Sequence, residues 1–225
     1  LAIKAMLGKS LRDQGYEGGL CKKQGLVGVK APVFSMAKLT GVDTYLGPEM
    51  KSTGEVMGVD HDFPSAVTKA LMAAGLRLPP QGSILLSIAD RHKAEAVDMI
   101  KDLARVGYQL YATEGTADMI SGLGVPVVAV PKRLNEGHPN VVDIIVDGMV
   151  DAVVNTVTGD RNVLQDGFNI RRAAVDQRIP CFTSLDTARA AAESLANGVD
   201  SYSVKPLSSY LLHGKDLISH TDQED

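Results

Sequence analysis

The sequence has no tryptophan, only two cysteines and no long apolar run, and each shortage narrows the class of protein. No apolar stretch approaches the roughly 18 residues that a membrane-spanning helix needs, so we expect no membrane partner. Cys21 and Cys181 form no CxxC pair and are too few for a disulfide framework, which favours a reducing, cytoplasmic location. A net charge of −4 and 4% aromatic residues give no basis for binding nucleic acid.

The common phosphate and nucleophile motifs are also missing. The chain contains no GxGxxG, no GxxxxGK[ST] and no GxSxG. Its five histidines are scattered without an i,i+4 pair, so we expect no metal site. The opening "LAIKAMLGKSL" begins inside a helical pattern and lacks an initiator methionine. We therefore expect the chain to be part of a longer polypeptide.

The first 80 residues predict a small irregular α+β segment. "GLVGVKAPVFSMAKL" is compatible with a strand, although Pro32 would interrupt its hydrogen-bond ladder. A helix is predicted from Asp62 as N-cap to Gly75 as C-cap, with Pro64 in the first turn. Its apolar stripe consists of Ala66, Val67, Ala70 and Leu71. "GLRLPPQGS", residues 75–83, then resembles a linker.

From residue 84 onward, strands and helices alternate. Strands are predicted at 84–89, 108–113, 125–130, 152–157 and 180–184, with helices near 93–106, 116–123, 140–149, 168–178 and 186–196. Nearly all-apolar strands separated by helices indicate an α/β domain: a five-stranded parallel sheet with helices on both faces. Arg171 and Arg172 are expected on the charged outer face of the fourth helix.

Polar residues gather where these strands end. Ligands of open parallel sheets bind outside the carboxyl ends of the strands, where helix N-termini present backbone N–H groups. Thr116 is the natural N-cap of the helix it opens, and Gly115 would allow a ligand close to the backbone. Capping is the simpler explanation for any single residue, but the convergence of several on one edge favours a phosphate monoester site. The residues at these strand ends are Ser87, Lys93, Thr113, Thr116, Lys132, Arg133, Asn155, Thr156, Thr158, Thr183, Ser184 and Asp186.

The segment "GVDTYLGPEMKSTGEVMGVD", residues 41–60, resembles the end of the second ATP-grasp half of the carbamoyl-phosphate synthase large subunit. "ATEGTA", "NEGHP", "VVNTVTG" and "IRRAAVDQRIPCFTSLDTA" extend the resemblance over about residues 1–197. The later part is similar to the methylglyoxal-synthase-like fold. The resemblance implies an ATP-grasp tail with a connecting helix at 1–79, a regulatory domain at 80–197 and a polar tail at 198–225.

The same resemblance implies a function for the whole enzyme. That enzyme makes carbamoyl phosphate from bicarbonate, glutamine-derived ammonia and ATP, for pyrimidine and arginine synthesis. Its ATP- and Mg²⁺-binding residues would precede this chain, which is therefore expected to hold no catalytic residue and no cofactor. Its implied partners are a glutaminase small subunit and the rest of the large subunit, and an oligomer is also compatible with the family.

Two effector sites are implied. Contacts to the phosphate of a nucleotide such as UMP would fall on Lys93, Thr113, Thr116, Lys132 and Asn155, with Ser87 and Thr158 nearby. An ornithine site in some members uses a carboxylate and a tyrosine that align here with Ala31 and Cys181. Of that second site only Asp166 and Thr183 remain, so we expect weak or no ornithine control.

Three alternatives stay open. A methylglyoxal synthase acting on dihydroxyacetone phosphate would use Asp160, but the histidine expected after the first strand is absent. A purine-pathway cyclohydrolase half has a similar "GGTA" stretch but needs a long loop with Lys and His that this chain lacks. A non-binding assembly module would use residues 1–60 as a docking surface, with the strand-end hydroxyls serving as caps.

Overall fold

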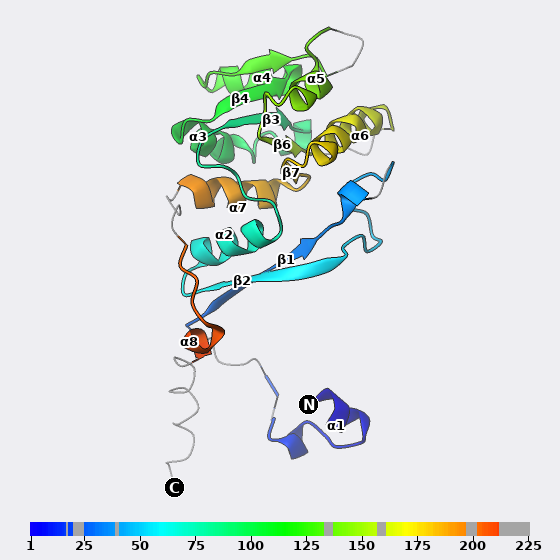
Figure 1. Cartoon of the computed structure of the whole chain (residues 1–225), viewed down its shortest axis with the longest axis vertical. Coiled ribbons are helices and arrows are strands. Elements are labelled where there is room, and N and C mark those ends of the chain that lie inside the picture. The colour runs from blue at the N-terminus through cyan, green and yellow to red at the C-terminus, as the bar shows by residue number, and fades with distance from the viewer. Residues whose placement is uncertain are drawn as a thin grey trace. The chain divides into compact units, whose positions relative to one another are not determined.

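Apolar segments between residues 83 and 182 form one five-stranded parallel sheet in the computed structural model of the chain (Figure 1). The structure describes residues 1–16, 18–19, 25–38, 41–132, 137–156, 161–196 and 202–211, with the backbone alone at 161–165, 207 and 211. The predicted parallel sheet is confirmed, although each strand is shorter than its sequence pattern. The order is β5-β4-β3-β6-β7, with β3 Ser83–Ser87, β4 Gln109–Thr113, β5 Val128–Val130, β6 Ala152–Asn155 and β7 Cys181–Phe182.

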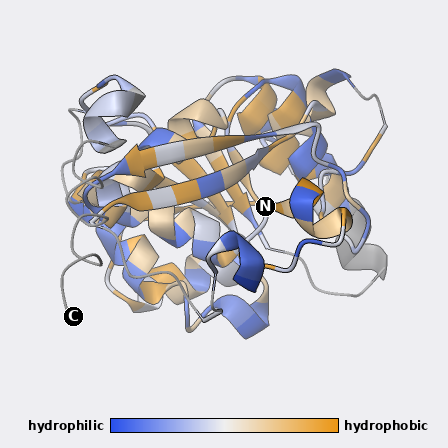
Figure 2. Cartoon of the chain, turned by 90° about the horizontal axis from the view of Figure 1, so that it is seen from below, coloured by the Kyte–Doolittle hydropathy of each residue, from blue (hydrophilic) through white to orange (hydrophobic). Residues whose placement is uncertain are grey.

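Each face of this sheet has its own hydrophobic core, because side chains alternate along a strand. Ile84 and Leu86 of β3 belong to one core, whereas Leu85 between them belongs to the other. Each such fully buried side chain contributes roughly 1.5–3 kcal/mol of hydrophobic free energy. Figure 2 shows hydrophobic residues gathered on the strands.

Helices complete both cores, as predicted. The first core is completed by α3 (Val97–Arg105), α4 (Glu114–Gly122) and α7 (Leu185–Ala196). The second is completed by α5 (Val141–Val146) and α6 (Arg161–Asp176). The sheet is therefore covered on both faces, and its carboxyl edge is where loops and helix starts meet.

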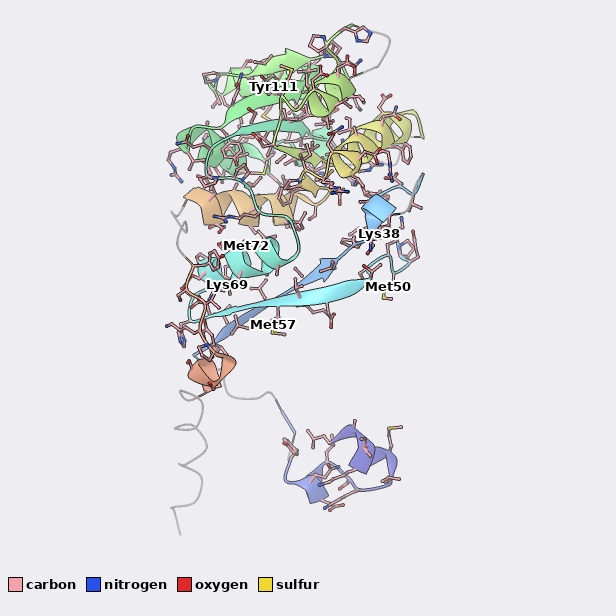
Figure 3. All side chains as sticks on the ribbon, viewed as in Figure 1. Lys38, Met50, Met57, Lys69, Met72 and Tyr111 are labelled. Atoms are coloured by element: carbon pink, nitrogen blue, oxygen red, sulfur yellow. The ribbon has the colours of Figure 1, made fainter. Side chains whose placement is uncertain are left out.

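A two-stranded antiparallel sheet precedes the five-stranded one in the chain. β1 (Val27–Val33) pairs with β2 (Gly54–Asp60). Only β1 is predicted from the sequence, because the two glycines of "GEVMGVD" weaken the strand pattern of β2. Pro32 lies opposite Glu55 and is tolerated because each strand is an edge strand. Figure 3 shows Met57 projecting from β2 on the side away from the helix α2 (Phe63–Ala73).

Helix α2 follows its sequence prediction closely. The carboxylate of Asp62 accepts a hydrogen bond from the backbone N–H of Ser65 at 2.8 Å, which caps the helix. Pro64 lies in the first turn, and the chain leaves the helix through Gly75 at φ +74°. The predicted apolar stripe is buried.

Gly58 explains how closely α2 packs on β2. A Cβ atom at Gly58 would lie 2.0 Å from the carbonyl oxygen of Ala66 and 2.5 Å from the backbone nitrogen of Ala70. Only glycine allows this approach. Lys69 of α2 reinforces the contact, because its Nζ lies 2.6 Å from Oδ2 of Asp60 on β2.

Three helix starts differ from the sequence prediction. α4 begins at Glu114, two residues before the predicted Thr116. α3 begins at Val97, after the 3₁₀ helix η3 (Asp90–His92) and a turn. α6 begins at Arg161 and not near 168, because Gly167, which resembles a breaker, lies inside the helix.

The chain divides into two units. Residues 26–206 hold both sheets, the helices α2 to α7, and η2 (Met36–Lys38). Residues 1–25 and 207–225 form the other unit, with α1 (Ala2–Met6), η1 (Arg12–Gln14) and α8 (Leu207–Leu211). The domain boundaries predicted at 79/80 and 197/198 stay predictions. No helix in the described ranges is long and apolar enough to cross a membrane.

Candidate anion site at the carboxyl edge of the sheet

Three of the predicted site residues end adjacent strands. Ser87 ends β3, Thr113 ends β4 and Asn155 ends β6. β3 lies between the other two strands, and Ser87 is directly opposite Asn155 in the pairing. All three side chains are buried, so the edge is lined by neutral hydroxyl and amide groups.

Thr116 binds a neighbouring loop and does not cap its own helix. Its Oγ1 accepts a hydrogen bond from the backbone N–H of Ile88 at 3.1 Å and from the hydroxyl of Thr113 at 3.3 Å. The N-cap position of α4 is Thr113, whose side chain makes no capping hydrogen bond. The predicted capping role of Thr116 is therefore wrong, because the loop after β3 takes its hydroxyl.

A second threonine holds the same loop from the other side. Oγ1 of Thr156, directly after β6, accepts a hydrogen bond from the backbone N–H of Ala89 at 2.8 Å. The loop that leads from β3 to Lys93 is thus held by hydroxyl groups from both neighbouring strand ends. Such hydrogen bonds fix the direction in which the loop leaves the sheet.

Lys93 lies over the start of α4. Its Nζ is 2.5 Å from the carbonyl oxygen of Gly115 and 2.8 Å from Oδ1 of Asp90. A Cβ atom at Gly115 would lie 3.3 Å from that Nζ, so a glycine at this position gives the ammonium room. The side chain of Asp90 is 93% exposed, and its bond to Lys93 is one that water or an anion can replace.

Lys132, two residues after the end of β5, carries a second positive charge at the carboxyl edge of the sheet. The hydrogen bond from Lys93 and then the charges of Lys93 and Lys132 hold the pKa of Asp90 below its usual value. Both lysines follow the carboxyl end of a strand of the sheet, Lys93 after β3 and Lys132 after β5. Hydroxyls, an amide and two ammonium groups at one edge are groups that suit a phosphate monoester.

Asn155 is held by an arginine that the sequence prediction placed elsewhere. Arg171 of α6 is fully buried and donates from Nη1 to Oδ1 of Asn155 at 2.7 Å. It also donates from Nε and Nη2 to the two carboxylate oxygens of Asp43, at 2.8 and 2.6 Å. The predicted charged-face location is thus wrong for Arg171, whereas Arg172 pairs with Asp176 one turn later.

The charges in this network are matched. Burial raises the pKa of Asp43, but hydrogen bonds from Arg171 and the Tyr45 backbone N–H, with the charges of Arg171 and Lys51, lower it overall. Burial also raises the pKa of the Cys181 thiol to about 12, with the charge of Arg171 lowering it and the charge of Asp43 raising it. Asp43 is therefore ionised and Cys181 neutral at pH 7.

The two residues of the predicted ornithine site lie on different elements. Asp166 on α6 and Thr183 after β7 are both partly buried, and no hydrogen bond joins them. Arg133 and Thr158 lie outside the described residues, as does Asp160. Within the described ranges, no three His, Cys, Asp or Glu side chains group as metal ligands would.

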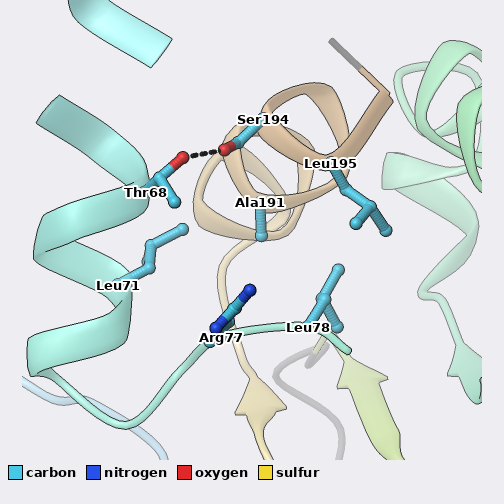
Figure 4. A pocket seen from close by; sticks show the side chains of 7 residues that line it. All are labelled: Thr68, Leu71, Arg77, Leu78, Ala191, Ser194 and Leu195. Atoms are coloured by element: carbon cyan, nitrogen blue, oxygen red, sulfur yellow. Dashed lines mark hydrogen bonds between the residues drawn. The ribbon is translucent and has the colours of Figure 1, made fainter. Parts of the chain in front are cut away.

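A small cleft lies elsewhere, between α2 and α7 (Figure 4). Its volume is about 30 Å³, which is enough for water but not for a nucleotide. The hydroxyls of Thr68 and Ser194 hydrogen-bond across it. None of the predicted effector residues lines it; its lining residues are Thr68, Leu71, Arg77, Leu78, Ala191, Ser194 and Leu195.

Comparison with known proteins assigns the class of the domain that carries this edge. Residues 95–183 match the family model of the MGS-like domain, so the chain contains a domain of that family. The chain is also homologous to the carbamoyl phosphate synthase large chain of Thermomicrobium roseum, with 52% identity over 210 residues. The match covers 93% of this chain but 20% of that protein, so the chain spans about a fifth of the relative's length.

The resemblance found in the sequence motifs is thereby confirmed. Among solved structures, the crystal structure of ForH aligns with 60% of this chain and 88% of its own chain, at 19% identity. Its TM-score of 0.39 is too low to support an argument about fold or function.

Proposed function

We propose that the carboxyl edge of the five-stranded sheet binds the phosphate of a nucleotide monophosphate, UMP or a similar effector. The observation that carries the proposal is the position of Lys93, whose Nζ contacts the carbonyl oxygen of Gly115 at the start of α4 and the exposed carboxylate of Asp90. A phosphate dianion can replace the side chain of Asp90 as the partner of Lys93, because that carboxylate is exposed.

We further propose that this binding regulates a longer enzyme of the carbamoyl phosphate synthase type. Support comes from the homology, which covers nearly all of this chain. In that enzyme, ATP and Mg²⁺ bind outside the present residues, ammonia comes from a glutaminase subunit, and the product serves pyrimidine and arginine synthesis in the cytoplasm. This chain then senses the nucleotide and holds no catalytic residue, and its ornithine control is weak or absent.

Calorimetric titration of the purified chain with UMP, IMP, phosphoribosyl pyrophosphate and ornithine tests the proposal. UMP at about 100 times its Kd is expected to raise the free energy of unfolding by roughly 2.7 kcal/mol. Absence of binding by every nucleotide would favour the non-binding assembly module. Formation of methylglyoxal from dihydroxyacetone phosphate would instead assign a lyase.

Lys93→Ala is the matching site variant. Loss of a hydrogen bond to a charged group costs about 1.5–3 kcal/mol, so UMP affinity is expected to fall about 10- to 150-fold. Lys101→Ala is the matched control, because Lys101 is an exposed lysine on α3 in the same domain. Equal UMP affinity in the two variants would show that Lys93 does not contact the phosphate.

A further inference from the structure

We propose that Arg171 is a positioning residue that makes Asn155 a hydrogen-bond donor toward the carboxyl edge and ties it to Asp43. This inference rests on the proposed function for its ligand. It adds which atom of Asn155 meets that ligand. It also adds a link from the edge to residues 41–53, the later part of the connection between β1 and β2, which carries Asp43.

The first step is the orientation of the Asn155 amide. A guanidinium group has donors only, so the group that faces it must be an acceptor. Nη1 of Arg171 lies 2.7 Å from Oδ1 of Asn155, and a flipped amide would place N–H against N–H. The carboxamide oxygen therefore faces Arg171, and the NH₂ group points elsewhere. An NH₂ group at this edge selects acceptor atoms such as phosphate or carboxylate oxygens.

The second step is that Arg171 is fixed and is not itself a ligand. It is fully buried, and both oxygens of Asp43 accept from it. The ring of Tyr45 lies 6.0 Å from its guanidinium carbon, which adds a cation–π contact at the limit of its range. A bidentate partner neutralises the charge and holds the guanidinium plane. Its effect on an anion therefore passes through Asn155.

Gly167 shows that α6 is shaped around this contact. It lies one turn before Arg171 in the helix interior, where glycine is normally unfavourable. A Cβ atom there would lie 2.6 Å from Nη1 of Arg171 and 3.2 Å from Oδ1 of Asn155. Glycine is the residue that leaves the space in which the guanidinium and the amide meet.

The third step links the edge to the segment that carries Asp43. Lys51 of this segment donates to the carbonyl oxygen of Tyr45 at 2.6 Å, so the segment has internal bonds of its own. α6 packs against η2, which precedes the segment in the chain. A shift of Asp43 would leave a buried guanidinium without its counter-ion, so Arg171 and Asn155 must follow it.

Gly167→Ala tests the positioning role without removing a charge. Its matched control is Gly122→Ala at the end of α4, where an added Cβ atom would meet no atom from outside the local helix backbone within 4 Å. We expect UMP affinity, measured by calorimetry, to fall about tenfold or more in Gly167→Ala and to stay unchanged in Gly122→Ala. In an Asn155→Ala background, Gly167→Ala should cause no further loss, because its effect passes through Asn155.

A spectroscopic readout separates positioning from a general structural effect. The side-chain NH₂ resonances of Asn155 should shift when UMP is added to the unmodified chain, and should shift less in Gly167→Ala. Asn155→Asp keeps an acceptor for Arg171 but replaces the NH₂ group with a second oxygen, so UMP binding should be lost although the protein folds. Asp43→Asn should also weaken UMP binding, although Asp43 is bonded to Arg171 and not to the ligand.

Three results would overturn the inference while the proposed function stands: equal UMP affinity in Gly167→Ala and Gly122→Ala, unchanged binding in Asn155→Asp, or an equal loss with and without the Asn155 side chain. If the unmodified chain binds no nucleotide, the proposed function fails and the inference fails with it. Should Gly167→Ala not fold, the Asn155→Asp result decides the question.

Discussion

The two halves of the carboxyl edge hold a cation in opposite ways. On the β3–β4 half, Lys93 is bonded to a carbonyl oxygen and to the exposed Asp90, and 23% of its side chain is accessible. On the β6 half, Arg171 is fully buried and bonded to both oxygens of Asp43. The first cation can exchange its partner for an anion at little cost. The second cannot, because removing its partner leaves a buried charge.

This difference predicts that the two cations affect ligand affinity and folding stability to different degrees. Lys93 should affect ligand affinity and hardly affect folding, whereas Arg171 should affect folding first and ligand affinity through Asn155. The four changes below test that separation, beginning with the largest expected effect.

Arg171→Met should cause the largest loss of stability. The expected cost is about 3 kcal/mol, the lower end for a buried ion pair, because Asn155 and the partly exposed Asp43 lose their donor. Urea unfolding followed by circular dichroism measures the change. Arg172→Met on the same helix, which breaks the i,i+4 pair with the half-exposed Asp176, should cost less than Arg171→Met, because neither member of that pair is fully buried. Equal losses of unfolding free energy in the two variants would contradict the conclusion that the buried Arg171 stabilises the fold.

Acid should remove part of the same stabilisation. The folded pKa of Asp43 lies below its unfolded value of about 3.9, so its contribution is complete above that pH and is lost as the pH falls through the folded pKa. Urea unfolding between pH 6 and about pH 3 should show a steeper fall in the unmodified chain than in Asp43→Asn. Asp118→Asn, at an exposed position of α4, should keep the steep fall.

Thr116→Val tests the hydroxyl that holds the loop on the Lys93 half. Valine has nearly the same shape but leaves the backbone N–H of Ile88 without its acceptor, which should cost about 1–3 kcal/mol. Thr116→Ser keeps the hydroxyl and should lose only the methyl contribution, about 0.8 kcal/mol. Urea unfolding compares the two variants, and a valine variant as stable as the serine variant would remove this role from Thr116.

Asp90→Asn should have the smallest effect, and in the opposite direction. Asp90 competes with an incoming phosphate for Lys93, so its neutralisation should raise UMP affinity, by no more than about fivefold for so exposed a pair. Calorimetry at low salt gives the clearest measurement, because salt screens surface charges. Weaker binding in Asp90→Asn would show that Asp90 helps the ligand instead of competing with it.

Local sequence patterns were sufficient for much of the fold. The helix from Asp62 to Gly75 was predicted with its cap, its proline and its apolar stripe, because all of these depend on neighbours within a few residues. The five parallel strands followed from apolar runs between helices. β2 was missed because its two glycines break the strand pattern. One of them, Gly58, allows the backbone of α2 to pack closely against β2.

For the candidate site, the sequence alone determined the residue types at the strand ends, since parallel strands always bring their carboxyl ends to one edge. That rule placed Ser87, Thr113 and Asn155 on one edge, and the strand order then shows that their strands are neighbours. Only the tertiary structure decided what each side chain does. Thr116 serves the loop at Ile88, and Arg171 is buried against Asp43, 128 positions earlier in the chain. Partners so far apart leave no periodicity or motif in a sequence, because only folding brings them together.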